Sequence, residues 1–491
     1  MLDGVWNMFT AAGDFMLKNL VLINIILSLV IVFFQRRSPQ KVWTWLLILY
    51  FIPIVGFILY LFIGQDYHKS RMFRAKDVDS EIKCAARRQE KNIHQKKLQF
   101  FGSGMKKFEK LVLYNLEAGQ AVLTDNNDVR IFTAGKEKFK VLLEEIKKAE
   151  HYIHFQYYVI RSDELWDAIA QALKQKAEQG VEVRVLVDGM GGRRFCKSDR
   201  EALKAAGIET AEFFPPVLGK LQLRINYRNH RKIVVIDGRI GFVGGLNVGR
   251  EYLGMDPRFG YWRDTHLCIE GSAVTSLAVR FALDWNYAAK ENLFLKDHLF
   301  RVPEYLREGH DPVQIISSGP DSQTKMIHDN YLHLIHDASD HIYIQTPYLV
   351  PDDSILDALK IAARSGIDVR IMIPCKPDHP FVYWATYSYA GELLEAGAKC
   401  YVYNPGFLHA KTLCVDGMAA CVGTANMDIR SFELNFEVNA VIYSEQTVQC
   451  LEDAFMNDIK DCRQITEDVY RHRPLSVRVK EQFSRLLSPL L

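Results

Sequence analysis

The sequence lacks the features that mark several classes of protein. Its nine cysteines are scattered and none forms a Cys-x-x-Cys pair, which argues against a structural zinc site and against a disulfide framework. Reduced thiols facing the cytoplasm are the simplest interpretation. The 491 residues carry a net charge of only +2, so no strong excess of basic residues indicates a nucleic-acid-binding protein. A chain of this length can form two or three domains with cores of their own.

Two long apolar runs lie near the N-terminus, at about 15–34 and 42–63. Each is about as long as a bilayer is thick. The first run lacks a basic segment before it and a small-x-small cleavage site after it, so a retained transmembrane hairpin over 1–64 is favoured over a cleaved signal peptide. Six Lys and Arg residues flank the hairpin and three lie in its loop. By the positive-inside rule, a multi-pass membrane protein with this distribution of basic residues is expected to hold its C-terminal part in the cytoplasm.

Two charged segments border the rest of the chain. Residues 65–112 are interpreted as a helical juxtamembrane connector, either a solvated helix or a basic collar for anionic lipid headgroups. Residues 469–491 are predicted to be an amphipathic tail, which either docks on the protein or lies in the membrane interface. The apolar residues of this tail recur at helical spacing and are Leu475, Val479, Phe483, Leu486 and Leu487.

One short pattern occurs twice in the chain. In both copies Lys follows His by two residues, Asp follows Lys by five, and Asn follows Asp by ten. Residues at i and i+2 of a strand share a face, and each Asp-Gly pair after a β-branched run indicates a hairpin turn. Each copy therefore presents an imidazole, an ammonium and a carboxamide to one spot, a set that suits a phosphodiester. The copies are His230, Lys232, Asp237 and Asn247, and His409, Lys411, Asp416 and Asn426.

The repeat extends well beyond the motif. A strand, an amphipathic helix ending at Gly, a second strand and a second helix precede each copy, and A-E-H-Y-I-H-F-Q-Y-Y-V-I at 149–160 matches A-S-D-H-I-Y-I-Q-T-P-Y-L-V at 338–350. This order predicts an α/β fold with a largely parallel sheet in each of two related domains, 113–300 and 301–468. A pseudo-two-fold arrangement of the domains would bring both halves of the site around one phosphate.

Two His-x-Lys-x4-Asp motifs resemble the hallmark of the phospholipase D superfamily, and the resemblance covers residues 120–468. The apolar run ending in F-I-P-I-V-G-F-I-L-Y-L-F-I-G and the closing R-L-L-S-P-L-L make the whole chain similar to the bacterial cardiolipin synthases of the two-motif kind. The resemblance implies a phosphatidyltransferase of phospholipid biosynthesis that works on phosphatidylglycerol in an anionic membrane. It implies no cofactor, no metal and no nucleic-acid partner, and leaves the oligomeric state open.

The resemblance also implies roles for individual residues. One histidine attacks phosphorus and the other moves the proton of the leaving and incoming alcohols; His230 is favoured as the nucleophile and His409 as the acid and base, but the order stays open. An acidic residue orients each histidine, and Glu437 and Asp264 match by position. For both motif aspartates a purely structural role in the Asp-Gly turn is an equal alternative. The non-bridging phosphate oxygens are assigned to Lys232, Lys411, Asn247, Asn426 and Thr424.

The implied reaction transfers a phosphatidyl group from one phosphatidylglycerol to another through a phosphohistidine, giving cardiolipin and glycerol. The alternatives are a phospholipase D-type hydrolase, a transphosphatidylase with another acceptor alcohol, a nuclease of the superfamily and a non-catalytic membrane scaffold. Two groups of basic residues have simpler interpretations. The histidines His328, His333, His336 and His341 are read as a polar helix face rather than a metal site, and Arg193, Arg194, Arg224, Arg228 and Arg231 as solvated residues or a rim for anionic headgroups.

Overall fold

The computed structural model describes residues 18–34, 39–63, 78–95, 103–215, 226–300, 309–322 and 324–488. The chain divides into two compact units, of which the smaller comprises Met1–Ser70 and Pro216–Tyr227 and the larger comprises Arg71–Pro215 and Arg228–Leu491. Residues 1–17 of the predicted hairpin, 64–77 and 96–102 around and within the predicted connector, and Arg224 lie outside the described residues.

The smaller unit contains three apolar helices, α2 (Leu20–Phe34), α3 (Pro39–Phe51) and α4 (Pro53–Ile63). The second predicted span, 42–63, is thus divided at Pro53, which cannot donate a backbone hydrogen bond. The side chain of Asn24 donates to the carbonyls of Leu49 and Pro53, both at 3.2 Å. Among the described residues, no helix combines the length and the apolarity that a membrane crossing requires.

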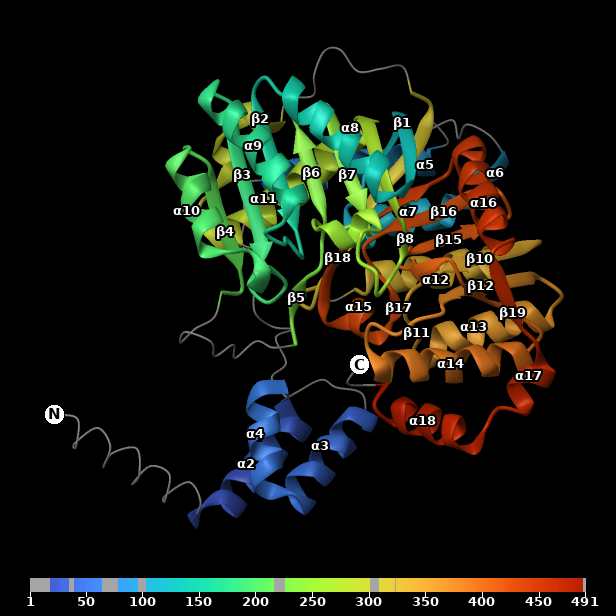
Figure 1. Cartoon of the computed structure of the whole chain (residues 1–491). Helices are drawn as coiled ribbons and strands as arrows, with labels where there is room; N and C mark the ends of the chain where they lie inside the picture. The colour runs from blue at the N-terminus through green and yellow to red at the C-terminus, as the bar shows by residue number, and fades with distance from the viewer. Residues whose placement is uncertain are drawn as a thin grey trace. The chain divides into compact units, whose positions relative to one another are not determined.

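The larger unit is built from two halves with the same strand order (Figure 1). In each half three parallel strands are followed by a run of antiparallel neighbours, in the orders β4-β3-β2-β6-β7-β8-β1 and β13-β12-β10-β15-β16-β18-β9. The antiparallel pair β1–β9 joins the halves. The fold is therefore mixed α/β with two related halves, as the sequence predicts. The prediction of a largely parallel sheet is wrong, because only two of the six neighbouring strand pairs in each order are parallel and the two strands of each motif hairpin are antiparallel. The first half contains β1 (Leu123–Ala134), β2 (Tyr152–Tyr157), β3 (Glu182–Asp188), β4 (Glu209–Phe213), β6 (Ile233–Ile236), β7 (Ile240–Gly244) and β8 (Tyr261–Gly271).

The strands of the second half are bounded in the same way. β19 (Cys462–Ile465) pairs with β13 at the edge of the sheet and has no counterpart among the pairings of the first half. The remaining strands are β9 (Asp311–Ser318), β10 (His341–Gln345), β12 (Asp368–Pro374), β13 (Lys399–Tyr403), β15 (Thr412–Val415), β16 (Ala419–Gly423) and β18 (Asn435–Ile442).

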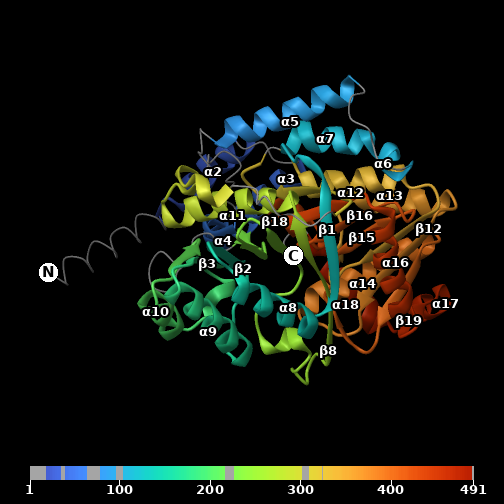
Figure 2. The ribbon, with the colours of Figure 1, turned by 90° about the horizontal axis from the view of Figure 1, so that it is seen from above.

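Helices cover both faces of the sheet in the first half, and its central strand β2 is therefore buried on both sides. All six residues of β2 are buried, and successive side chains of a strand point to opposite faces. His154 stacks on Phe281 of α11 (Ala273–Ala289) at 4.3 Å, whereas Phe155 lies 6.3 Å from Trp166 of α9 (Glu164–Glu178). Accordingly, α9 and α11 lie on opposite faces of the first half, as Figure 2 shows.

The second half has a corresponding set of helices. Its core also includes residues of the predicted connector, since Ile93, Met105 and Phe108 are each at most 2% exposed. The connector's helices thus belong partly to the folded body. The helices of the connector are α5 (Val78–His94), α6 (Ser103–Lys107) and α7 (Glu109–Gly119). The other helices of the second half include α12 (Met326–Asp337), α13 (Asp353–Arg364), α14 (Pro380–Glu395), α16 (Glu445–Ile459), α17 (Glu467–Arg471) and α18 (Leu475–Leu486). The first half also contains α8 (Gly135–Lys148) and α10 (Lys197–Ala205).

Both predicted hairpins are present. The turn between β6 and β7 has positive φ at Asp237 (54°) and Gly238 (65°), and the turn between β15 and β16 repeats this at Asp416 (53°) and Gly417 (66°). Two successive positive φ values are what a type I′ turn requires, and Asp-Gly is a preferred sequence for it. The Asp-Gly pairs therefore determine where each hairpin reverses.

Candidate active site

Each motif histidine is held by the backbone of the opposite half. The short strand β5 (Arg228–Asn229) runs parallel to β18, and β14 (Gly406–Leu408) runs parallel to β8. His230 N donates to Phe436 O at 2.9 Å, and His409 N donates to Arg263 O at 2.7 Å. The histidines and lysines consequently lie in the extended segments between β5 and β6 and between β14 and β15, rather than within a strand.

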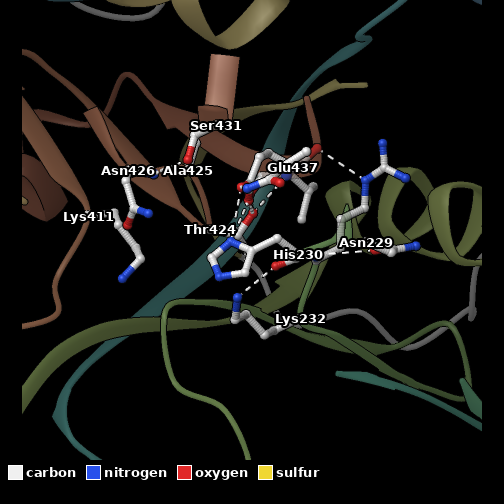
Figure 3. Close-up of polar contacts among 12 residues, drawn as sticks. Asn229, His230, Lys232, Lys411, Thr424, Ala425, Asn426, Ser431 and Glu437 are labelled. Carbon is white, nitrogen blue, oxygen red and sulfur yellow. Dashed lines mark hydrogen bonds and ion pairs between the residues drawn. The ribbon is translucent and has the colours of Figure 1, made fainter. Parts of the chain in front are cut away.

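The acidic partners also cross between the halves, and Figure 3 shows one of the two pairs, His230 with Glu437. His230 Nδ1 lies 3.0 Å from both carboxylate oxygens of Glu437, and His409 Nδ1 lies 2.7 Å from Asp264 Oδ2. An ionised carboxylate only accepts hydrogen bonds, so each Nδ1 is the protonated nitrogen and each Nε2 keeps its lone pair. Neither Nε2 has a partner among the described residues. Each half therefore supplies one histidine and the acid that orients the other.

The electrostatics of the pairs favour neutral imidazoles beside ionised carboxylates. Burial lowers the pKa of His230 to about 4 and also lowers that of His409. Burial alone would raise the pKa of Glu437 and Asp264, but the facing imidazoles and lysines outweigh it and lower both values. At neutral pH the site thus has nitrogen lone pairs available for reaction.

Two buried lysines supply positive charge to the site. Lys232 and Lys411 are at most 1% exposed, and each Nζ donates to the backbone carbonyl of the histidine two residues before it. Burial lowers the pKa of both ammonium groups, that of Lys411 to about 8. Lys411 is close enough that its charge lowers the pKa of His230 and of Lys232. The two motifs therefore act on one another electrostatically.

The motif aspartates lie away from the histidines. Asp237 accepts the backbone N–H groups of Glu150, His151 and Tyr152, each at 2.8 Å. Asp416 accepts the corresponding groups of Ser339, Asp340 and His341, at 2.8–2.9 Å. Each aspartate follows its lysine by five residues, about 16 Å of extended chain. The carboxylates of Asp237 and Asp416 therefore link their hairpin turns by hydrogen bonds to the backbone at the start of β2 and of β10.

The residues assigned to the phosphate are placed differently from one another. Asn247 accepts from Val159 N at 3.1 Å and donates to the Tyr252 hydroxyl at 3.3 Å. Asn426 donates to Asp428 at 3.3 Å, and its buried Oδ1 has no partner among the described residues.

Thr424 directs its hydroxyl at Glu437 Oε2, at 2.6 Å, and this single hydrogen is not free for a phosphate oxygen. The equivalent position in the first half is Gly245. A Cβ there would lie 2.0 Å from Asp264 Oδ1, so the approach of Asp264 excludes a side chain at 245. Thr424 thus supports the carboxylate of Glu437, and Gly245 makes room for that of Asp264.

Next to each histidine and its acid lies an ion pair that the sequence did not indicate; the first is fully buried and the second is partly buried. Arg231 pairs with Asp284 of α11 and donates to Glu437 O at 3.1 Å. Arg263 pairs with Asp458 of α16 at 2.8 Å and donates to Asp264 O.

Both aspartates also accept from a glutamine at equivalent strand positions, Gln156 in β2 and Gln345 in β10. Gln156 lies in the segment 149–160 and Gln345 at the equivalent position of the matching segment 338–350. This repetition is the sequence signal that could have indicated the two ion pairs.

The arginines and histidines that the sequence predicts to be surface residues differ in their exposure and contacts. Arg228 and Arg231 are at most 4% exposed, so they are not solvated rim residues, whereas Arg193 and Arg194 are exposed. His328 and His341 form separate ion pairs, with Asp329 and Asp352 and with Asp340 and Glu452. The described residues contain no group of three or more side chains arranged to hold a metal ion.

Comparison with known proteins agrees with this architecture. The family model described as cardiolipin synthase, phospholipase D-like domain, matches residues 142–272 and 331–459, and a phospholipase D-nuclease N-terminal model matches 22–65. The major cardiolipin synthase ClsA of Bacillus subtilis is 46% identical over 482 residues, covering 98% of this chain and 99% of its own. A cardiolipin synthase of Listeria welshimeri is 47% identical over 479 residues, covering 97% and 99%.

A solved structure shares the fold at much lower identity. The phosphatidylserine synthase of Haemophilus influenzae is 14% identical with a TM-score of 0.58, and the match covers 74% of this chain and 95% of that one. At this identity the likeness concerns the fold alone. The matches along nearly the whole chain decide the family: the chain belongs to the cardiolipin synthases of the phospholipase D-like type.

Proposed function

We propose that the protein is a membrane-bound cardiolipin synthase that transfers a phosphatidyl group from one phosphatidylglycerol to the headgroup of another. The observation that carries the proposal is the crossed pairing of two buried histidines with Glu437 and Asp264, in a chain whose relatives are named cardiolipin synthases. Two equivalent imidazoles with free Nε2 atoms suit a reaction in which one phosphodiester replaces another.

In the first step His230 Nε2 attacks phosphorus and the bond to the headgroup glycerol oxygen breaks. His409 donates a proton to that oxygen, so glycerol leaves as the neutral alcohol and a phosphatidyl-histidine remains. Burial and the charge of Lys411 both lower the pKa of His409. A bound phosphodiester anion offsets this charge and favours the protonated form of His409 that the step requires.

In the second step the headgroup hydroxyl of another phosphatidylglycerol attacks phosphorus. His409 accepts its proton, the phosphorus–nitrogen bond breaks, and cardiolipin is released. The assignment of His230 as nucleophile follows the family and is part of the proposal. Lys232, Lys411 and the amide of Asn426 would hold the non-bridging oxygens, because the lysine charges are buried beside both histidines.

We also propose that residues 1–64 anchor the enzyme as a multi-pass hairpin, with the catalytic body in the cytoplasm. The match of residues 22–65 to the N-terminal family model and the apolar helices α2 to α4 support the anchor. The orientation rests on the excess of basic residues outside the hairpin loop. An anchor would keep the site at the lipid surface, where a lipid hydroxyl competes with water for the intermediate.

The test is a product analysis with the full-length enzyme in phosphatidylglycerol vesicles. Cardiolipin and free glycerol should form in equal amounts, and His230→Ala and His409→Ala should each abolish both. His336→Ala is the matched control, since His336 is exposed on α12 and should retain activity. Phosphatidic acid without cardiolipin would identify a hydrolase instead. A phosphatidyl adduct on the peptide containing His409 rather than His230 would reverse the proposed roles.

A further inference from the structure

The C-terminal helix α18 packs on the protein with its polar side. Glu481 and Ser484 are at most 1% exposed, while a stripe of larger apolar residues faces outward. A helix on a globular protein normally does the reverse. The members of this apolar stripe recur at i, i+4, i+8 and i+11 and are Leu475, Val479, Phe483 and Leu486, with exposed fractions of 75%, 59%, 56% and 79%.

Polar contacts hold α18 in this orientation against α14, beside which it lies in Figure 1. Arg473 pairs with the buried Glu481 at 2.7 Å, and Arg485 pairs with Glu392 of α14. The Lys480 ammonium lies 5.1 Å from the centre of the Trp384 ring. Glu481 is buried on the inner side of the helix and Arg485 reaches α14, so turning the apolar stripe inward would break both ion pairs.

An arginine-rich hollow adjoins the inner side of α18. It has a volume of about 350 Å³ and lies among α14, α17 and α18. Its lining contains four arginines and two glutamates, Arg471, Arg473, Arg478, Arg485, Glu392 and Glu395. Three of the arginines form ion pairs, Arg471 with Glu467, Arg473 with Glu481 and Arg485 with Glu392. Arg478, which is exposed on α18, has no acidic partner among the described residues. On α14, the half-exposed Phe381 lies 6.3 Å from Phe483 and extends the stripe.

We propose that α18 is an interfacial helix that inserts its apolar stripe into an anionic lipid bilayer, with the neighbouring arginines against headgroup phosphates. An exposed apolar face bordered by basic residues is the pattern of helices that lie in a membrane surface. Anionic lipid complements the charges of Arg478 and Lys480, which are exposed on α18 beside the stripe, and its acyl chains bury the stripe. The proposal rests on the proposed function only in taking a bilayer lipid as substrate, and it adds a contact outside the catalytic site.

The first test is photocrosslinking of the full-length His409→Ala enzyme, which needs no turnover, in vesicles whose phosphatidylcholine carries a diazirine acyl chain. Peptides covering 475–486 should be labelled, and adding phosphatidylglycerol should increase the label. Val479→Glu with Leu486→Glu should remove it. Leu295→Glu is the matched control, because Leu295 is also 75% exposed but lies in the first half. Arg478→Gln should reduce the increase caused by phosphatidylglycerol.

The second test uses the active enzyme. The Val479→Glu, Leu486→Glu enzyme should need about a tenfold higher mole fraction of phosphatidylglycerol for half-maximal rate, with kcat unchanged. Absence of lipid label on 475–486 in the parent enzyme would overturn the proposal, and crosslinks between copies there would identify a second chain as the occupant. Lipid labelling of α18 in an enzyme that makes no cardiolipin would leave the helix assignment intact and refute the proposed function.

Discussion

Replacing Glu437 by Gln tests the crossed pairing most directly. Glu437 is fully buried and accepts hydrogen bonds from His230 Nδ1, from Asn435 Nδ2 at 3.1 Å and from the Thr424 hydroxyl at 2.6 Å. Glutamine has nearly the same volume and can keep an oxygen toward His230 and Asn435. Its amide nitrogen would face Thr424, whose hydroxyl can accept it and turn to donate to Val438 O, 3.2 Å away. The fold should therefore survive while the negative charge is lost.

The expected loss of activity follows from the change in one hydrogen bond. A hydrogen bond to a charged group contributes about 1.5–3 kcal/mol, and His230 gains positive charge when its Nε2 bonds to phosphorus. Since about 1.4 kcal/mol corresponds to tenfold in rate, kcat should fall roughly ten- to 150-fold. The binding of lipid should change little, because Glu437 has no contact with the headgroup in the proposed complex.

The assay is the initial rate of cardiolipin formation in phosphatidylglycerol vesicles, with the melting temperature measured on the same preparation. Thr424→Val is the control, because it removes a neutral donor but keeps the charge of Glu437, and it should lower kcat only about two- to tenfold. If Glu437→Gln keeps kcat within twofold of the parent at an unchanged melting temperature, the carboxylate does not act through His230, and the reasoning is refuted.

Three further predictions concern the turns, pH and metals. Asp237→Asn should lower stability by about 2–3 kcal/mol, through three weakened backbone contacts, and leave kcat of the folded enzyme nearly unchanged; a hundredfold loss of kcat at constant melting temperature would contradict the structural role. The hydrogen bond to Glu452 is the main cause that raises the pKa of His341 from 6.5 to about 9. Because the folded-state pKa is the higher one, this contribution to stability is full below pH 6.5 and is lost as pH rises through 9. The melting temperatures of the parent and His341→Gln should therefore differ at pH 6 and converge near pH 10. A chelator should leave the rate unchanged, because Lys232 and Lys411 supply the positive charge, and rescue by a divalent cation after chelation would contradict this.

Local patterns in the sequence predicted the mixed α/β class, the two related halves and the hairpins that carry the motif residues. The Asp-Gly pairs predicted the hairpin turns because few other dipeptides adopt two positive φ values in succession. The repeated strand and helix signals predicted a mixed α/β fold with two related halves, since each signal depends only on neighbouring residues. The matched segments also contained Gln156 and Gln345, whose partners lie more than one hundred residues away in the chain.

Partners that meet only in the folded chain could not be predicted in this way. Arg231 is next to His230 in the sequence, which predicts a solvated residue or a rim for anionic headgroups, but in the fold Arg231 is buried and contacts Asp284 and the Glu437 carbonyl. The sequence assigns Thr424 to the phosphate because a threonine hydroxyl can donate a hydrogen bond to a phosphate oxygen. In the folded chain β18 places Glu437 Oε2 2.6 Å from the Thr424 hydroxyl, which donates its hydrogen bond to that carboxylate.

The sequence by itself determined the residue types of the site, the two-fold repetition and the family, because these depend on spacing along the chain. Tertiary structure alone decided which acid serves which histidine, since β5 pairs with β18 and β14 with β8 across the two halves. It also decided the orientation of α18. An amphipathic pattern shows that a helix has two faces, but only the ion pairs of Arg473 and Arg485 determine which face is turned to the protein.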